Sequence, residues 1–314
     1  MLSYIFRRLL GVIPVMLVVG VFVFSLLHLA PGDPAAIIAG DNASEANIAR
    51  IRSSLGLDRP LLEQFTKWGL STLRGDLGVS MFSNIAVTTL IGQRVGPTFS
   101  LAATTMLVAV SIAVTFGVLA AWMAGTLLDR VVMGVAVMGF SVPVFVVGYL
   151  MVYFFALQWH WLPVQGYVAL SDGFWPWLQH LILPSVALGL AYVALIARIT
   201  RASMLDVLAE DYIRTASAKG VATRPMLLRH ALKNAAVPIV TVVGIGVALL
   251  ISGVVITESV FNIPGIGRLV VDAISRRDYP IIQGVMVTFA AVYVLINLMV
   301  DISYSFFDPR IRYS

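Results

Sequence analysis

Six long stretches of this chain contain no Asp, Glu, Lys or Arg, and they restrict the fold more than any other feature. A bilayer core about 30 Å thick is crossed by an α-helix of roughly 20 apolar residues. Because a charge inside lipid is costly, each charge-free run of this length predicts one membrane-spanning helix. The six runs are residues 9–30, 99–124, 131–157, 178–197, 235–257 and 279–300.

Composition agrees with a membrane protein. Of the 314 residues, 59% are hydrophobic and only 12% are charged, whereas about a quarter of an average soluble domain is charged. The chain has no cysteine, which excludes disulfides, thiolate nucleophiles and cysteine-based metal sites. The first run is too long for the core of a signal peptide and is expected to be a retained anchor. We therefore predict an all-α polytopic membrane protein with six transmembrane helices.

The distribution of basic residues predicts how the spans are oriented. Residues 198–235 contain seven Lys or Arg and three Asp or Glu, a net charge of +4. Basic loops are typical of the cytoplasmic side, so this loop and, with an even number of spans, both termini are expected in the cytoplasm. The opposite loop, 158–177, has no Lys or Arg and carries four tryptophans. They favour an aromatic belt at the membrane surface, with substrate stacking as the alternative: Trp159, Trp161, Trp175 and Trp177.

Four regions follow from these spans. Residues 1–30 form an N-terminal transmembrane helix, and 31–97 form an external segment that is long enough to escape the charge rule. Short helices are expected there, one capped by Ser44 and one following Pro60. Residues 98–304 form a core of five helices that includes the cytoplasmic loop 198–235. Residues 305–314 form a cytoplasmic tail.

Small residues and prolines suggest how the helices pack. The triplets at four-residue steps predict close helix contacts: Gly117, Ala121 and Gly125, and Gly244, Ala248 and Ser252. Pro143 and Pro184 are expected to interrupt their helices, which is tolerated where the freed carbonyls find partners or face water. Glu258 and Asp301 lie at span ends and are interpreted as paired or solvated boundary charges, with a role in the passage as the alternative.

The basic loop contains the most informative motif, DYIRTASAKGVATRPMLLRHALKNAAVP, at residues 211–238. Asp211 is a plausible N-cap, and Gly220 lies where a helix end favours positive φ. Pro225 suits the first turn of a second helix. A short basic helix at this surface has two explanations, which are attraction to anionic lipid and docking onto a protein.

This stretch resembles the EAA loop of permeases in binding-protein-dependent ABC importers, in the RTA-x-AKG form of the dipeptide, oligopeptide and nickel branch. Arg214, Thr215 and Ala216 occupy the three central positions, and Gly220 keeps the spacing. Similar motifs cover nearly the whole chain: IFRRLLGVIPV, LAPGDP, GDLGVS, TRASMLDVLAEDYIRTASAKG, ESVFNIPGIGRL, RRDYP and DPRIR. The resemblance implies the type I ABC importer permease fold in a cell inner membrane.

The resemblance also implies partners and a coupling site. The partners would be a second homologous permease subunit, two cytoplasmic ABC ATPases and an external solute-binding protein. The helix would dock into a groove on an ATPase as a coupling helix. Its expected contact residues are Tyr212, Arg214, Thr215, Ala216, Lys219 and Gly220. Small side chains allow close approach, and the basic ones make charge-assisted contacts.

The chain is expected not to be an enzyme. It contains no Gly-rich phosphate loop ending in Gly-Lys-Ser/Thr, so ATP and Mg²⁺ would be bound by the partner ATPases, with no cofactor or metal in this chain. The spans hold few ionisable residues, which disfavours an ion-coupled secondary transporter. A membrane-embedded hydrolase is disfavoured because its usual motifs are not evident. The resemblance implies ATP-driven import of di- or oligopeptides, with glutathione or nickel as alternatives and no nucleic acid expected as a partner.

Overall fold

The computed structural model describes residues 2–29, 33–39 and 43–307. Within these residues there is no β-strand beyond an isolated bridge between Val79 and Ala86. The helices are α1 (Leu2–Leu29), α2 (Pro34–Ala39), α3 (Glu45–Leu55), α4 (Leu61–Leu73), α5 (Val87–Trp122), α6 (Leu127–Ser141), α7 (Val144–Met151), the π-helix η1 (Val152–Gln158), the 3-10 helix η2 (Leu170–Asp172), α8 (Phe174–Leu208), α9 (Asp211–Ala218), α10 (Thr223–Pro225), the π-helix η3 (Met226–Ala231), α11 (Leu232–Asn234), α12 (Ala236–Val260), α13 (Ile266–Arg276) and α14 (Tyr279–Phe307).

The six predicted spans correspond to four single helices and two bent pairs in the described part of the chain. The single helices are α1, α5, α8 and α14. One bent pair is α6 with α7 and η1, which meet at 103°, and the other joins residues 223–234 to α12 at 65°. The prediction of an all-α polytopic membrane protein is therefore confirmed.

The first of two compact units comprises Met1–Val95 and Leu269–Val294. Ser44 caps α3 by accepting a hydrogen bond from the Asn47 N–H, as the sequence predicts. Helix α4 starts directly after Pro60. It packs on α1 through aromatic rings, because the Phe24 ring centroid lies 5.3 Å from that of Phe65 and 5.9 Å from that of Trp68. The short helices predicted for residues 31–97 are present as α2, α3 and α4.

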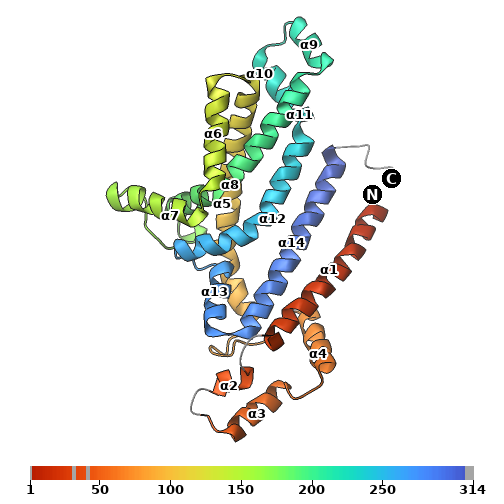
Figure 1. Cartoon of the computed structure of the whole chain (residues 1–314), viewed down its shortest axis with the longest axis vertical. Helices are drawn as coiled ribbons and strands as arrows, with labels where there is room; N and C mark the ends of the chain where they lie inside the picture. The colour runs from red at the N-terminus through yellow and green to blue at the C-terminus, as the bar shows by residue number, and fades with distance from the viewer. Residues whose placement is uncertain (1, 30–32, 40–42, 308–314) are drawn as a thin grey trace. The chain divides into compact units, whose positions relative to one another are not determined.

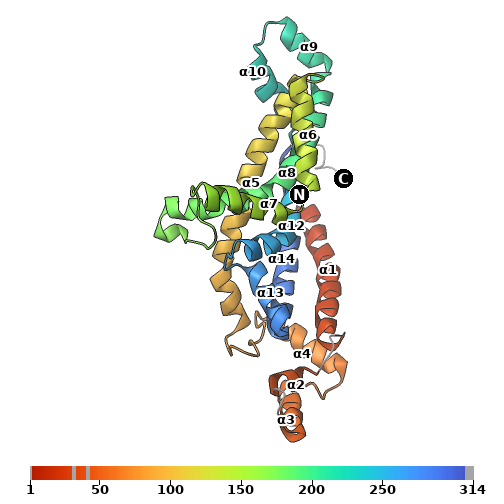
Figure 2. The ribbon, with the colours of Figure 1, turned by 60° about the vertical axis from the view of Figure 1, so that its left-hand side comes forward.

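The second unit comprises Gly96–Arg268 and Leu295–Ser314 and is built around α8. Helices α6, α7 and α12 all pack against α8, and α9 with α10 lies at one end of this unit (Figures 1 and 2). Small residues also permit close approach between α5 and α8 and between α12 and α14. A Cβ on Gly117 would lie 2.6 Å from the Cβ of Thr200, and one on Gly244 would lie 2.4 Å from a methyl of Val300.

Two details of the predicted packing are wrong. Pro184 does not interrupt its helix, because α8 continues from Phe174 to Leu208 with the proline ring buried. A single lost hydrogen bond is tolerated where neighbouring helices enclose the backbone. Gly125 is not part of a helical stripe, since α5 ends at Trp122 and Gly125 has φ +82° in the following turn.

Pro143 does interrupt its helix, as predicted. Val142, the residue before it, is extended, with φ −89° and ψ 127°. A residue that precedes proline is sterically driven out of the helical region, so α6 ends at Ser141. Pro143 then precedes the first residue of α7, and the chain continues in a new direction (Figure 1).

Candidate functional site

The predicted coupling segment folds as the eight-residue helix α9. Its N-cap is Glu210, one residue before the predicted Asp211, with φ −69° and ψ 145°. Gly220 adopts φ +81°, as its position predicts. The N–H of Gly220 bonds to the Ser217 carbonyl and that of Val221 to the Ala216 carbonyl, which satisfies two of the last carbonyls of the helix.

Two side chains of α9 hold it against the rest of the second unit. Ile213 is 4% exposed and belongs to a hydrophobic cluster with residues of α5, α8, η3 and α12. The Tyr212 hydroxyl accepts a hydrogen bond from the Asn234 amide at 2.9 Å and donates one to the His230 carbonyl at 3.5 Å. These contacts link α9 to the segment that enters α12.

The other predicted coupling residues lie on α9 or at its end and face away from this cluster. Arg214, Thr215, Lys219 and Gly220 are exposed, and Ala216 is half-buried. The Arg214 side chain is 75% exposed, and its ion pair with Asp211 is long at 3.6 Å. All six predicted residues thus lie on α9 or directly after it. Tyr212 is exposed and also makes hydrogen bonds to His230 and Asn234.

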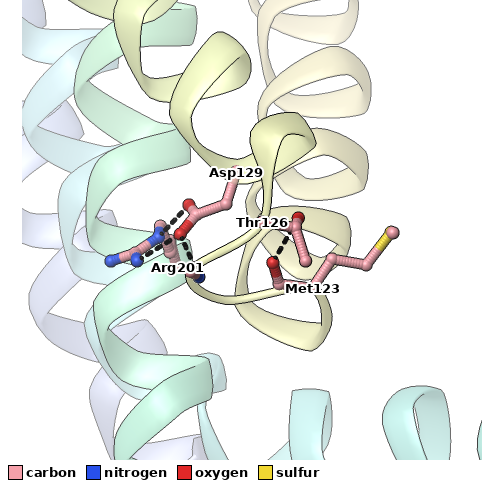
Figure 3. Close-up of polar contacts among 5 residues, drawn as sticks. Met123, Thr126, Asp129 and Arg201 are labelled. Carbon is pink, nitrogen blue, oxygen red and sulfur yellow. Dashed lines mark hydrogen bonds and ion pairs between the residues drawn. The ribbon is translucent and has the colours of Figure 1, made fainter.

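An ion pair that sequence reasoning missed braces the same end of the unit (Figure 3). The Asp129 carboxylate accepts hydrogen bonds from Arg201 Nε at 2.6 Å and Nη2 at 2.7 Å. It also accepts one from the Gly125 N–H at 2.9 Å. Asp129 is 4% exposed, so this bidentate contact ties the α5–α6 turn to α8. Arg201 lies in α8, which extends beyond the predicted span end at residue 197.

Glu258 anchors the ESVFNIPGIGRL motif. Its side chain is fully buried, and Oε1 accepts a hydrogen bond from the Thr98 hydroxyl at 2.6 Å. Oε2 accepts one from the Arg268 N–H at 2.9 Å. A Cβ on Gly265 would lie only 1.9 Å from Oε1, so glycine is required for this approach. Glu258 is therefore buried and hydrogen-bonded rather than solvated, and its interpretation as a paired boundary charge stays a prediction; the Asp301 side chain lies outside the described residues.

Two other motifs meet in the first unit. The Ser80 hydroxyl, at the end of GDLGVS, donates a hydrogen bond to Asp278 Oδ2 of RRDYP at 2.6 Å. Asp278 is 2% exposed and also accepts a bond from the Met81 N–H at 3.3 Å. Both motifs thus have a structural role within the unit.

The loop tryptophans do not form a single cluster. Trp159 and Trp161 lie in a tilted contact with ring centroids 4.7 Å apart, and Trp175 and Trp161 are exposed. Among the described residues no group of three His, Cys, Asp or Glu side chains is placed to hold a metal ion.

These features are those of a polytopic membrane protein that presents an exposed helix at one end. Two family models match the chain. "Binding-protein-dependent transport system inner membrane component" matches residues 113–313. "Binding-prot-dependent transport system membrane comp, N-term" matches residues 1–102. The chain belongs to the family of binding-protein-dependent transport system inner membrane components.

Relatives are similar over their full length. The probable peptide ABC transporter permease protein y4tP of Sinorhizobium fredii is 58% identical over 310 residues, covering 99% of both chains. The glutathione transport system permease protein GsiC of Escherichia coli K12 is 44% identical over 313 residues, covering 100% of both. GsiC of Salmonella choleraesuis is 45% identical over the same length.

Proposed function

We propose that this chain is one of two homologous permease subunits in an ATP-driven importer of di- or oligopeptides. The observation that carries the peptide assignment is the 58% identity, over nearly the whole chain, to a relative named as a probable peptide permease. The relative named for glutathione, itself a tripeptide, makes glutathione the second candidate.

The proposed partners are the second permease subunit, two cytoplasmic ATPases that bind ATP and Mg²⁺, and an external solute-binding protein. Membership of a binding-protein-dependent transport family supports the ATPases and the binding protein. No cofactor is assigned to this chain. Residues 31–97 are assigned to the external side, and residues 198–235, the tail 305–314 and both termini to the cytoplasm, on the basis of the basic loop.

In the proposed mechanism, α9 docks into a groove on an ATPase through Arg214, Thr215, Ala216, Lys219 and Gly220. ATP-driven closure of the two ATPases moves α9. The buried Ile213 and the Tyr212 hydrogen bonds carry this motion to η3, α11 and the start of α12. The spans then change the side from which the passage is open, and peptide released by the binding protein enters.

Uptake of a radiolabelled dipeptide into sealed vesicles tests this function. The vesicles hold the complete transporter, with the binding protein outside and ATP either enclosed or omitted. We expect uptake only with enclosed ATP and competition by unlabelled dipeptide. Competition by glutathione but not by dipeptide would select the second candidate, and competition by nickel alone would reject both peptide classes. Uptake without ATP that depends on an ion gradient would overturn the proposal.

A further inference from the structure

An apolar groove lies beside the coupling helix in the second unit. One wall is the last part of α5, and the other is the segment from α10 to α11, with a volume of about 370 Å³ between them. Seven of its ten lining residues are apolar. Trp122 is 51% exposed and Leu228 is 49% exposed, so the groove is open to its surroundings. Its apolar lining residues are Val114, Val118, Leu119, Trp122, Leu227, Leu228 and Leu232.

The two walls place the groove at the edge of the bilayer. The α5 wall belongs to a charge-free span, residues 99–124, so it lies at the depth of lipid chains near the membrane surface. The other wall belongs to the basic loop, where the surface begins. Tryptophan at such a boundary is typical of the headgroup zone.

A cation also lines this groove. Arg224 is an exposed residue of α10 and makes no ion pair with any carboxylate among the described residues. Ion pairs in this part of the chain go to Arg201 and Arg214. The groove therefore combines an apolar floor for hydrocarbon with one guanidinium available for an anion.

We propose that this groove binds one anionic phospholipid. The acyl chains lie against Val118, Trp122 and Leu228, and the phosphate or acidic headgroup pairs with Arg224. Charge complementarity selects this occupant, since a basic loop at a membrane surface attracts anionic lipid and the bilayer supplies that lipid at this depth. A helix from another protein would have to bring its own carboxylate to Arg224. The lipid site does not depend on the proposed orientation of the chain. That orientation decides only whether the bound lipid belongs to the cytoplasmic leaflet.

Trp122 provides the measurement, because brominated acyl chains quench tryptophan fluorescence on contact. The full chain is placed in phosphatidylcholine nanodiscs that contain a small fraction of brominated lipid, either phosphatidylglycerol or phosphatidylcholine. The difference between the wild-type chain and Trp122→Phe isolates the groove from the other five tryptophans. We expect the brominated phosphatidylglycerol to quench Trp122 with about five-fold higher apparent affinity than brominated phosphatidylcholine.

A matched pair of charge variants separates a site from general attraction. Arg224→Gln is expected to remove the preference for phosphatidylglycerol. Arg229→Gln removes the same charge from the π-helix η3 at a position that does not line the groove, and is expected to keep most of the preference. Equal loss in both variants, or equal quenching by both lipids, would overturn the site.

The same measurement on the assembled transporter tests for a protein occupant. Quenching of Trp122 that persists in the complex supports a lipid site in the working protein. Quenching that disappears on assembly would show that a partner subunit covers the groove and would overturn the proposal. Neither result depends on which solute is transported, so a failure here is distinguishable from a failure of the proposed function.

Discussion

At the scale of single residues, Asp129 combines burial with a full set of partners. Its side chain is 6% exposed and receives both Arg201 hydrogen bonds and the Gly125 N–H. Replacing it by asparagine removes the negative charge but keeps the size. We expect Asp129→Asn to lower the free energy of unfolding by about 1–3 kcal/mol, because the partly exposed Arg201 charge is left without its counterion. Thermal unfolding of the purified chain in detergent measures this loss.

The control is the exposed ion pair on α9. Asp211 is 98% exposed and lies 3.6 Å from Arg214, a geometry in which solvent screens the attraction. Asp211→Asn makes the same chemical change and is expected to leave the unfolding temperature unaltered. Equal unfolding temperatures for the two variants would show that the Asp129 contact contributes little to stability.

The residue scale is also where the sequence was least informative. The partners of Asp129 and Glu258, Arg201 and Thr98, lie 72 and 160 positions away along the chain. Such pairs depend on the rotation and register of packed helices, which no local pattern specifies. Gly265 could have been suspected from its motif, but its reason, the 1.9 Å approach to Glu258, exists only in the folded unit.

At the scale of elements, α9 has one face held to the second unit and the other exposed. We expect Arg214→Glu to lower ATP-driven uptake at least about ten-fold, because reversing a charge at a docked surface opposes its partner. The substitution should not alter insertion or thermal stability, since the Arg214 side chain is 75% exposed. Uptake assays and unfolding of the same preparation separate the two effects.

The control for α9 is Arg229→Glu, an equal charge reversal at an exposed position in the π-helix η3. It should retain most of the uptake. Normal uptake by Arg214→Glu, or an equal loss in both variants, would remove α9 from the coupling role.

The ends of helices were predictable from the sequence where local chemistry determines them. Ser44, Pro60 and Gly220 act at their helix ends as the sequence indicates, because capping and positive φ are local properties. The two prolines show the limit of this reasoning. Pro143 ends a helix and Pro184 does not, although both lie in charge-free runs, so the presence of a proline did not decide where a helix breaks. The bend of 103° after α6 could not be read from composition.

At the scale of the whole molecule, the class and family were predictable because hydrophobic runs and dispersed motifs extend over the entire chain. The six runs correspond to helices, and the predicted family is confirmed by models that match residues 1–102 and 113–313. Orientation stays a prediction, because it follows from the charge of one loop. The 31–97 segment contains six Lys or Arg residues and yet is assigned to the external side, so it is the strictest place to test that prediction.

The absence of cysteine from the sequence allows this test directly. Single cysteines are introduced at three exposed positions: Thr66 in α4, Ser171 in the tryptophan loop and Ser217 in α9. A membrane-impermeant maleimide is then applied to spheroplasts and to inside-out vesicles. We expect Thr66→Cys and Ser171→Cys to be labelled in spheroplasts and Ser217→Cys only in inside-out vesicles. The unmodified chain gives the background in both preparations.

The pattern of labelling also decides how the bent pair of α6 with α7 and η1 crosses the bilayer. If that pair forms one span, Thr66 and Ser171 lie on the same side, with α5 and the pair between them. If it only enters and returns, α5 alone separates them, and Ser171 is labelled from the side opposite to Thr66. In that case α8 would return Ser217 to the side of Thr66, and the six-span topology with a cytoplasmic α9 would be wrong. Labelling of Ser217 alone in spheroplasts would instead invert the whole orientation and place α9 beyond the reach of a cytoplasmic ATPase.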